Sequence, residues 1–306
     1  MGRNDRPNFL RMRKSLVIVA LFCTVLFGCG KDEAPEVPPR NVSFYVTGFT
    51  QELSPIPVSK AKLAVVRKME SPATNNLSTY IGTLKFLLFD AQGKLVLQRT
   101  QASDGAAFGT FSERIKDGKY IAYFIGGPGD ASTDLAAFSI SNLVHDKDTF
   151  VKQVDFSVDQ TDKVVDVTLD RFGAKLKIQL TDAFPEDITS LKLHVKLLNK
   201  LNFVTKAAES TQPEEGLVYE FDPAVRTKDA SLSLFCGLFP GASYKVTGVL
   251  KAYDKDNKVV YNREIKDITL ENNKLTTVTG NAFFDYTEGF TIKINADYGG
   301  NIDQKF

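Results

Sequence analysis

Residues 84–98 read LKFLLFDAQGKLVLQ. A run of Leu and Phe ends at the polar group Asp90-Ala91-Gln92-Gly93, and an alternating apolar run begins at Leu95. Aspartate early in a turn and glycine at its end are typical of a tight hairpin, because glycine adopts a positive φ at little cost. The stretch therefore predicts two antiparallel strands joined by a short turn.

The same alternation of apolar and polar residues, the pattern of a half-buried strand, continues through most of the chain. Lys119–Ile125 is almost wholly apolar, which predicts a strand buried on both faces. Ser132–Leu143 is the one short helix expected, with Ser132 or Thr133 as its N-cap. Further strands are expected at residues 42–46, 108–115, 154–158, 165–169, 174–180, 191–197, 219–221, 232–234, 244–246, 249–253, 258–261, 276–278 and 290–294.

Strands that follow one another without intervening helices favour antiparallel sandwiches over βαβ units. The sequence therefore predicts an all-β chain with two tandem Ig-like antiparallel β-sandwich domains. We expect the N-terminal domain at residues 41–170 and the C-terminal domain at residues 171–306, with the boundary near Asp170-Arg171.

A second hairpin is predicted at residues 253–260, YDKDNKVV, which echo residues 89–96, FDAQGKLV. The echo is explained either by a duplicated domain or by convergence of tight hairpins on the same turn residues. The surrounding strands do not align at the same offset, which favours convergence.

The first 28 residues have the organisation of a secretory signal. Basic residues (Arg3, Arg6, Arg11, Arg13 and Lys14) precede the apolar run Leu16–Phe27. As a helix this run reaches about 18 Å, against about 30 Å for the hydrocarbon core of a bilayer. A signal peptide over residues 1–28 is therefore preferred to a membrane anchor made by this helix.

Leu26-Phe27-Gly28-Cys29 resembles the lipobox of bacterial lipoproteins, with one departure, because Phe27 is bulkier than the usual residue. The resemblance implies cleavage before Cys29 and several acyl chains, such as palmitate, on that residue. Lys31-Asp32-Glu33 resembles the lysine-plus-acidic tag that sends lipoproteins of the Bacteroides group to the cell exterior; an ordinary solvated charge run is the alternative. The prolines that follow predict a semi-rigid tether over residues 29–40.

The charge balance and the cysteine count limit which partners the chain can bind and whether a disulfide can stabilise it. After Gly28 the chain holds 33 basic and 36 acidic residues. This balance gives no electrostatic case for nucleic acid. Of three cysteines, Cys23 would be removed with the signal and Cys29 would be lipidated, which leaves Cys236 without a partner for an intramolecular disulfide. The core must supply the stability.

No catalytic centre, cofactor site or metal site is predicted. His194 lies between the outward residues Lys192 and Lys196, so it is expected in solvent. His145 lies in a polar loop without the second nitrogen or sulfur ligand that a transition-metal site needs. Cys236 has apolar neighbours, which suits an inert core thiol.

Two further stretches resemble ligand-binding loops and fail in detail. Asp254–Asn257 begins like a calcium loop, but Val259 and Ile265 stand where glycine and glutamate are needed. Gly126–Gly129 lacks the Gly-Lys-Ser/Thr ending of a phosphate loop. We therefore expect no enzyme activity.

The aromatic residues leave carbohydrate binding as a possible function, since exposed aromatic rings form the platforms on which sugars stack. The chain has no Trp, and most tyrosines fit alternating strands as half-buried residues. The tyrosines that suit an exposed platform are Tyr45, Tyr80, Tyr219, Tyr253 and Tyr286.

Residues 84–94, Asp117-Gly118-Lys119-Tyr120 and residues 169–176, LDRFGAKL, together resemble the fimbrillin superfamily of the Bacteroides group, in particular its lipidated anchor or accessory subunits. The resemblance implies two transthyretin-like sandwich domains, surface display and assembly by strand exchange between subunits. Shaft subunits of that family lose an N-terminal strand by cleavage after arginine, whereas anchors keep it. Arg40 and Arg67 are the candidate positions here.

The function expected is that of a surface-exposed outer-membrane lipoprotein, held by lipid on Cys29 and paired with other fimbrial subunits through β-strands. Residues 289–295 are a candidate exchange segment, and an ordinary last strand paired in its own domain is the alternative. The alternative function is a glycan- or ligand-binding surface lipoprotein beside an outer-membrane transporter.

Overall fold

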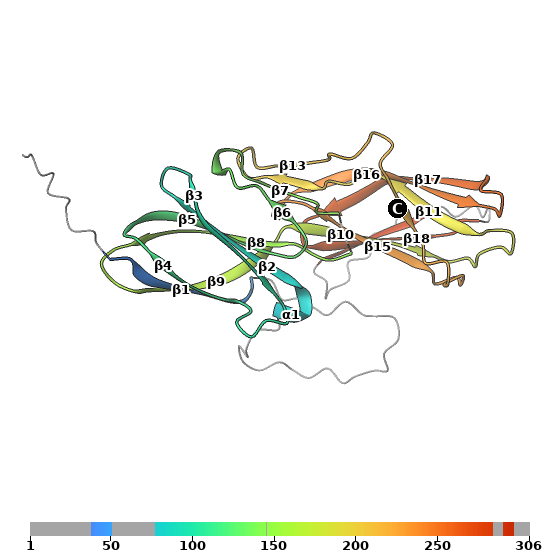
Figure 1. Ribbon diagram of the computed structural model, residues 1–306. Helices are drawn as coiled ribbons and strands as arrows, with labels where there is room; N and C mark the ends of the chain where they lie inside the picture. Colours follow the sequence, from blue (N-terminus) through green and yellow to red (C-terminus); the bar gives the residue numbers. More distant parts are fainter. Residues whose placement is uncertain (1–37, 51–76, 145, 284–289, 297–306) are drawn as a thin grey trace, which may run out of the picture. The chain divides into compact units, whose positions relative to one another are not determined.

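The computed structural model describes residues 38–50, 77–144, 146–283 and 290–296. These residues form β-strands with very little helix, so the predicted all-β class is confirmed (Figure 1). All of them belong to a single compact unit, Pro38–Phe306. Among them there is no helix with the length and apolar character that crossing a membrane requires.

Seven strands from the first part of the chain form one sheet, in the order β3-β2-β5-β8-β9-β1-β4. A short helix, α1 (Leu77–Tyr80), precedes β2. The strands are β1 (Arg40–Phe49), β2 (Thr83–Asp90), β3 (Leu95–Ala102), β4 (Thr110–Ile115), β5 (Gly118–Gly126), β8 (Phe150–Val158) and β9 (Lys163–Arg171).

This sheet folds over between β8 and β9. These two strands are joined through just two residue pairs, Phe150↔Arg171 and Val151↔Asp170. Side chains from β2, β5 and β8 meet side chains from β9, β1 and β4 in one core, which a flat sheet would not allow. The folded sheet therefore forms the first sandwich.

β5 is buried on both faces, as its apolar run predicts. Tyr120, Ala122 and Phe124 face the core of the first sandwich. Tyr123 and Ile125 face a second apolar cluster on the other side of the sheet. A strand covered on both faces has no solvated face for polar residues, which explains its composition.

The second apolar cluster is covered by a small sheet of order β13-β12-β7-β6. Its elements are β6 (Asp130–Ala131), the 3₁₀ helix η1 (Leu135–Ala137), β7 (Ser139–Ser141), β12 (Lys200–Asn202) and β13 (Ala207–Glu209). The predicted helix over Ser132–Leu143 is therefore wrong. The side chain of Asp134, rather than Ser132 or Thr133, caps the single turn, and the short apolar run around it is too brief to sustain a helix.

The second part of the chain forms a sandwich of two four-stranded sheets, β15-β10-β18-β19 and β14-β11-β16-β17, with an apolar core between them. The strands are β10 (Gly173–Leu180), β11 (Ser190–Val195), β14 (Leu217–Glu220), β15 (Ser231–Gly237), β16 (Ser243–Tyr253), β17 (Val259–Glu271), β18 (Lys274–Gly280) and β19 (Thr291–Ala296).

The pairing is not purely antiparallel, which corrects one part of the prediction. β1 pairs with β9 in parallel, and β10 pairs with β18 in parallel. Period-two alternation is the same in both kinds of ladder, so the sequence pattern could not distinguish them.

The chain passes from the first sandwich to the second at Phe172, between the end of β9 and the start of β10. This is close to the expected boundary between residues 41–170 and 171–306. However, β7 from before this point pairs with β12 from after it. The assignment of two separate domains therefore remains a prediction.

Both predicted hairpins are confirmed, and their turns share one hydrogen-bond arrangement. Oδ1 of Asp90 accepts bonds from the backbone N–H groups two and four residues further on, at 3.0 and 2.9 Å. Oδ1 of Asp254 does the same at 2.9 and 2.9 Å. Gly93 and Asn257 supply the positive φ, at 79° and 62°. These shared requirements are a physical reason for the echo between the two stretches.

Candidate functional site

The N-terminal strand β1 is an interior strand of the seven-stranded sheet, between β4 and β9. Its residues Val42, Phe44 and Val46 are 0% exposed. The Phe44 ring lies 5.0 to 5.4 Å from three other phenylalanine rings. Loss of β1 would therefore open a slot lined by aromatic side chains, with unpaired backbone groups on both walls.

The position of β1 means that cleavage at the two candidate arginines would have different consequences. Arg40 is the first residue of β1, with its Nε 3.6 Å from Oδ1 of Asp117. A cut after Arg40 would leave residues 41–49 joined to the rest of the chain. Arg67 lies beyond β1 in the sequence but outside the described residues, so a cut there would sever the covalent link between β1 and the body.

The strand β19 lies at the edge of its sheet. Within the described ranges it pairs with β18 alone, through six antiparallel residue pairs. Phe290 lies over Gly280, where an added Cβ would be 2.3 Å from the Phe290 ring. Phe290 and Ile292 are partly buried against the core. β19 is thus held by one ladder and a few side chains, unlike β1.

Side chains bridge the two outermost strands of the seven-stranded sheet, β3 and β4. The Gln101 amide donates to the Thr110 carbonyl at 2.7 Å and accepts from the Gly109 N–H at 2.9 Å. Arg99 pairs with Glu113, with an Nε–Oε1 distance of 2.8 Å. The Gln101 amide thus takes the place of a peptide group, and the bridges protect two edges that would otherwise invite pairing.

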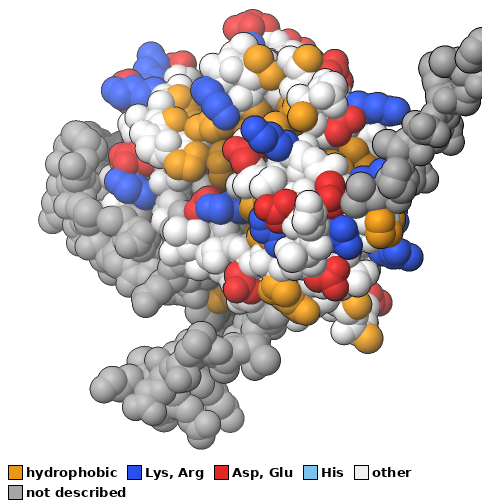
Figure 2. Space-filling model, turned by 90° about the vertical axis from the view of Figure 1, so that its left-hand side faces the viewer, with side chains coloured by type: hydrophobic (Ala, Val, Ile, Leu, Met, Phe, Trp, Pro, Cys, Tyr) orange, Lys and Arg blue, Asp and Glu red, His pale blue; other side chains and the backbone are white. Residues whose placement is uncertain are grey.

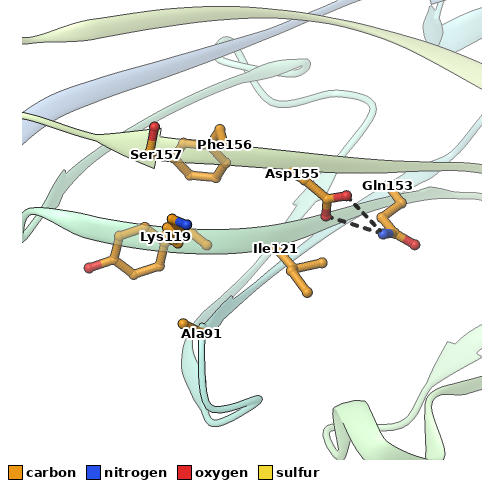
Figure 3. Close-up of a pocket in the computed structure, with 8 residues that line it drawn as sticks. Ala91, Lys119, Ile121, Gln153, Asp155, Phe156 and Ser157 are labelled. Carbon is orange, nitrogen blue, oxygen red and sulfur yellow. Dashed lines mark hydrogen bonds between the residues drawn. The ribbon is translucent and has the colours of Figure 1, made fainter.

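An open hollow of about 460 Å³ lies on the outer side of β5 and β8 (Figure 3). Nε2 of Gln153 donates to Asp155 at 3.2 Å, and Oε1 of Gln153 accepts from the Tyr123 hydroxyl at 2.8 Å. Burial, and then the charge of Asp155, raise the pKa of Tyr123 to about 12, so the hydroxyl remains a donor. The hollow is lined by Ala91, Lys119, Tyr120, Ile121, Gln153, Asp155, Phe156 and Ser157.

The surface charges agree with the nearly neutral balance of the sequence. On the face shown in Figure 2, Lys and Arg side chains are interspersed with Asp and Glu, and hydrophobic side chains form small separate groups. This face therefore presents no broad field of one sign.

Several residues singled out from the sequence lie outside the described residues: Cys29, Lys31, Asp32, Glu33, Arg67, His145 and Tyr286. The lipidation site and the export tag therefore stay predictions.

Cys236 is the inert core thiol that the sequence predicts. It is buried, and its Sγ lies 3.6 Å from the Tyr244 hydroxyl. Burial raises the pKa of the thiol to about 11. A thiol that is neutral and inaccessible at pH 7 is unsuited to nucleophilic chemistry.

His194 is half-buried rather than fully solvated. Its Nε2 lies 3.4 Å from the hydroxyl of Tyr253, which comes from the neighbouring strand. Within the described ranges no three His, Cys, Asp or Glu side chains gather as a metal site would require.

The proposed aromatic platform does not form among the described tyrosines. Tyr45 is 40% exposed. Tyr80, Tyr219 and Tyr253 are half-buried, and Tyr80 packs edge-on against Phe49 with ring centroids 5.5 Å apart.

A buried polar cluster, which the sequence reasoning missed, lies where the chain passes between the sandwiches. Arg171, 4% exposed, lies with its Nε 2.6 Å from Oδ2 of Asp148 and donates to Oδ1 of Asn273 at 2.6 Å. Nδ2 of Asn272 donates to the Leu238 carbonyl at 2.8 Å. Burial raises the pKa of Asp148 to about 6, against the opposing charge of Arg171. No local signal marks these residues, because their partners are distant in sequence.

Comparison with known proteins places the chain by family and by fold. The model of the family of unknown function DUF6562 matches residues 135–306, more than half of the chain. The chain belongs to this family. The matched residues of this DUF6562 protein cross the boundary expected near Asp170, and no curated protein matches its sequence.

The fold of the DUF6562 protein is similar to solved structures from Bacteroidales. One, described as "putative polysaccharide binding proteins (DUF1812)" from Bacteroides thetaiotaomicron, has a TM-score of 0.50 and 10% identity over 84% of this chain and 96% of that chain. A "putative adhesin" from Bacteroides ovatus has a TM-score of 0.49 and 9% identity over 75% and 83%. The fimbrial anchor protein Mfa2 from Porphyromonas gingivalis has a TM-score of 0.47 and 10% identity over 88% and 100%.

At this identity the first of these matches shows a shared fold and nothing finer. It agrees with the all-β architecture of the DUF6562 protein.

Proposed function

We propose that the protein is a surface-exposed outer-membrane lipoprotein that acts as a fimbrial anchor or accessory subunit. Lipid on Cys29 would hold it to the membrane, and Lys31-Asp32-Glu33 would direct it to the cell exterior. Its two sandwiches would pair with neighbouring subunits through β-strands and carry no enzyme activity.

The observation that supports assembly by strand pairing is the position of β19. It is the last strand described, it lies at a sheet edge, and it has one partner, β18. Removal of β19 would expose the backbone of β18 together with the space that Phe290 and Ile292 fill. An extended segment from another subunit could occupy that edge with the same main-chain bonds and side-chain pockets.

The fate of β1 would separate an anchor or accessory role from a shaft role. β1 is in place between β4 and β9, and its core residues are fully buried. The resemblance to the fimbrillin superfamily implies that shaft subunits lose this strand and that anchors keep it. A subunit with β1 in place presents no slot there, so its pairing must use an edge such as that of β19.

The glycan-binding alternative has less support. Within the described residues Tyr45 is the one tyrosine more than a third exposed, so three exposed rings on one face are not found there. The hollow beside β5 and β8 offers an ordered amide and carboxylate, but of its two aromatic residues Tyr120 is 9% exposed and Phe156 is partly buried against the core.

A reversible lock on β19 tests the assembly mechanism. Thr279 and Thr291 are directly opposite each other on β18 and β19. Cysteines at both positions would form a cross-strand disulfide that keeps β19 in its own sheet. We expect cells that carry T279C/T291C to lose incorporation of this subunit into surface assemblies under oxidising conditions and to recover it after reduction.

The control is each single cysteine variant, which cannot form the intramolecular disulfide. The buried Cys236 should not interfere, because its thiol is inaccessible. Normal incorporation of the oxidised double variant, with the disulfide confirmed by thiol titration, would exclude exchange of β19.

Lipidation is tested separately. Labelled palmitate should enter the wild-type protein and should be absent from Cys29→Ser, which should be lost from the outer membrane fraction. Equal labelling of Cys29→Ser would overturn the anchor assignment.

A further inference from the structure

The outer face of the sheet β14-β11-β16-β17 carries a group of basic and aromatic side chains, here called the β11–β16 patch: Lys192, His194, Lys251 and Tyr253. Lys192 on β11 is directly opposite Lys251 on β16. Side chains directly opposite each other in an antiparallel pair have Cβ atoms about 4.5–5.5 Å apart. All four residues are half-buried, so the patch is open to solvent on one side.

Tyr253 lies close to two of the other members of the patch, Lys192 and His194. The Lys192 Nζ lies 5.1 Å from the centroid of the Tyr253 ring. The hydroxyl of the same ring lies 3.4 Å from Nε2 of His194. The phenol therefore holds an ammonium group and an imidazole on the same small area of the sheet.

Positive charge at this patch is only partly balanced. Lys192 lies 4.0 Å from Glu220, the limit of an ion pair. Within the described residues no carboxylate lies within ion-pairing distance of Lys251. Two other acids near the sheet are paired elsewhere: Glu214 with Lys196, and Glu264 with Lys266. Like charges directly opposite each other on neighbouring strands are destabilising. The pair of Lys192 and Lys251 therefore lowers the stability of the fold unless an anion is bound to it.

The two lysines affect the protonation of His194. Its pKa is lowered, first by partial burial and then by the charges of Lys251 and Lys192. A lowered pKa leaves the imidazole neutral at pH 7, with one N–H to donate. The patch therefore combines ammonium groups, an imidazole and a phenol, each of which carries a hydrogen-bond donor.

We propose that the β11–β16 patch binds an oxyanion, such as the carboxylate of an acidic sugar or the phosphate of a lipid headgroup. Lys251 and Lys192 supply the charge, and His194 with Tyr253 donates hydrogen bonds to the bound oxygens. The single acid at the rim, Glu220, competes with the ligand for Lys192. This is a binding site on the surface of the second sandwich, independent of strand exchange at β19.

The chain offers a direct spectroscopic test, because it has two histidines. In a His145→Gln variant of the otherwise intact mature chain, His194 is the only imidazole, and its ring signals report its protonation by NMR. Sodium sulfate, compared with sodium chloride at equal ionic strength, should raise the His194 pKa by about one unit, which corresponds to about tenfold tighter binding to the protonated form.

Three variants assign the effect. K251Q should raise the His194 pKa in chloride, because a neighbouring positive charge is gone, and should abolish the further response to sulfate. E220Q should bind sulfate several-fold more tightly. K245Q is the matched control, because Lys245 lies on the same strand but pairs with Asp267 at 3.3 Å, and it should respond like the parent.

Glucuronate and glycerol 2-phosphate, titrated at fixed pH, distinguish an acidic sugar from a lipid phosphate as the source of the anion. A response to either that depends on Lys251 supports the site. Equal shifts with chloride and sulfate would mean ionic screening alone, and an unchanged response in K251Q would place the anion elsewhere; either result overturns the proposal.

Discussion

At the scale of single residues, Gly127 is held where no other residue fits. Its φ is +110°, and a Cβ added there would be 2.2 Å from the carbonyl oxygen of Asp148. The contact is with backbone, which cannot move aside as a flexible side chain does. The close approach of the backbone therefore explains a glycine at this position of the Gly126–Gly129 run, which does not match a phosphate loop.

We expect Gly127→Ala to lower the free energy of unfolding by more than about 3 kcal/mol, since backbone strain and a steric clash add together. Gly241→Ala is the matched control, because Gly241 also has a positive φ, +77°, but has open space around it. That variant should cost about 1 kcal/mol. Urea unfolding of both variants gives the comparison, and equal losses would contradict the clash.

A second prediction at the scale of residues concerns Asp148 and the dependence of the free energy of unfolding on pH. Its pKa is about 6 in the folded protein, above the ordinary value of 3.8. The folded state therefore holds this proton more tightly than the unfolded state. Its contribution to stability is complete below about pH 4 and is lost as the pH rises through 6, a change on the order of 3 kcal/mol.

The measurement is the free energy of unfolding of the parent and of Asp148→Asn between pH 4 and pH 8. Other carboxylates titrate in both proteins, so their effects cancel in the difference. Relative to the variant, the parent should lose stability across this range. A difference that does not change with pH would mean that Arg171 keeps Asp148 ionised throughout.

At the scale of elements, β1 joins the two sides of the first sandwich through Phe44. Because Phe44 is fully buried against three other rings, Phe44→Ala should cost about 3–5 kcal/mol. Val164→Ala on the neighbouring strand is the control, because Val164 is 66% exposed, and it should change stability by less than about 0.5 kcal/mol. Thermal or urea unfolding measures both; similar costs would show that β1 is not anchored in the core.

The strands and hairpins were predictable because their determinants are local. Asp90 and Gly93 fix one turn, and the alternation along β10 and β11 fixes which side chains face the core. What the sequence could not show depends on partners distant in the chain. The parallel pairing of β1 with β9 and the bridge from Gln101 to Thr110 leave no mark on the local pattern.

The candidate site was predictable to a similar extent. The outward direction of Lys192 and His194 follows from alternation along one strand. The register between β11 and β16 places Lys251 and Tyr253 beside them. Alternation along a single strand does not determine this register.

At the scale of the whole molecule, the two sandwiches share a core. Phe203, from the second part of the chain, lies 5.8 Å from Tyr123 and 5.5 Å from Phe138, both from the first part. Phe172 and Phe239 extend this group, with ring centroids 5.5 and 5.2 Å from that of Phe203. Separation of the two parts would expose these rings to water, so each part stabilises the other.

This shared core leads us to expect that residues 30–306 unfold in a single cooperative transition. Differential scanning calorimetry should give equal calorimetric and van't Hoff enthalpies. Phe203→Ala removes the ring common to these contacts and should lower the midpoint and separate the unfolding of the two sandwiches. Two resolved transitions in the parent protein would instead mean that the sandwiches fold independently and that the interface between them adds little. In that case a hinge at Phe172 would be open to motion.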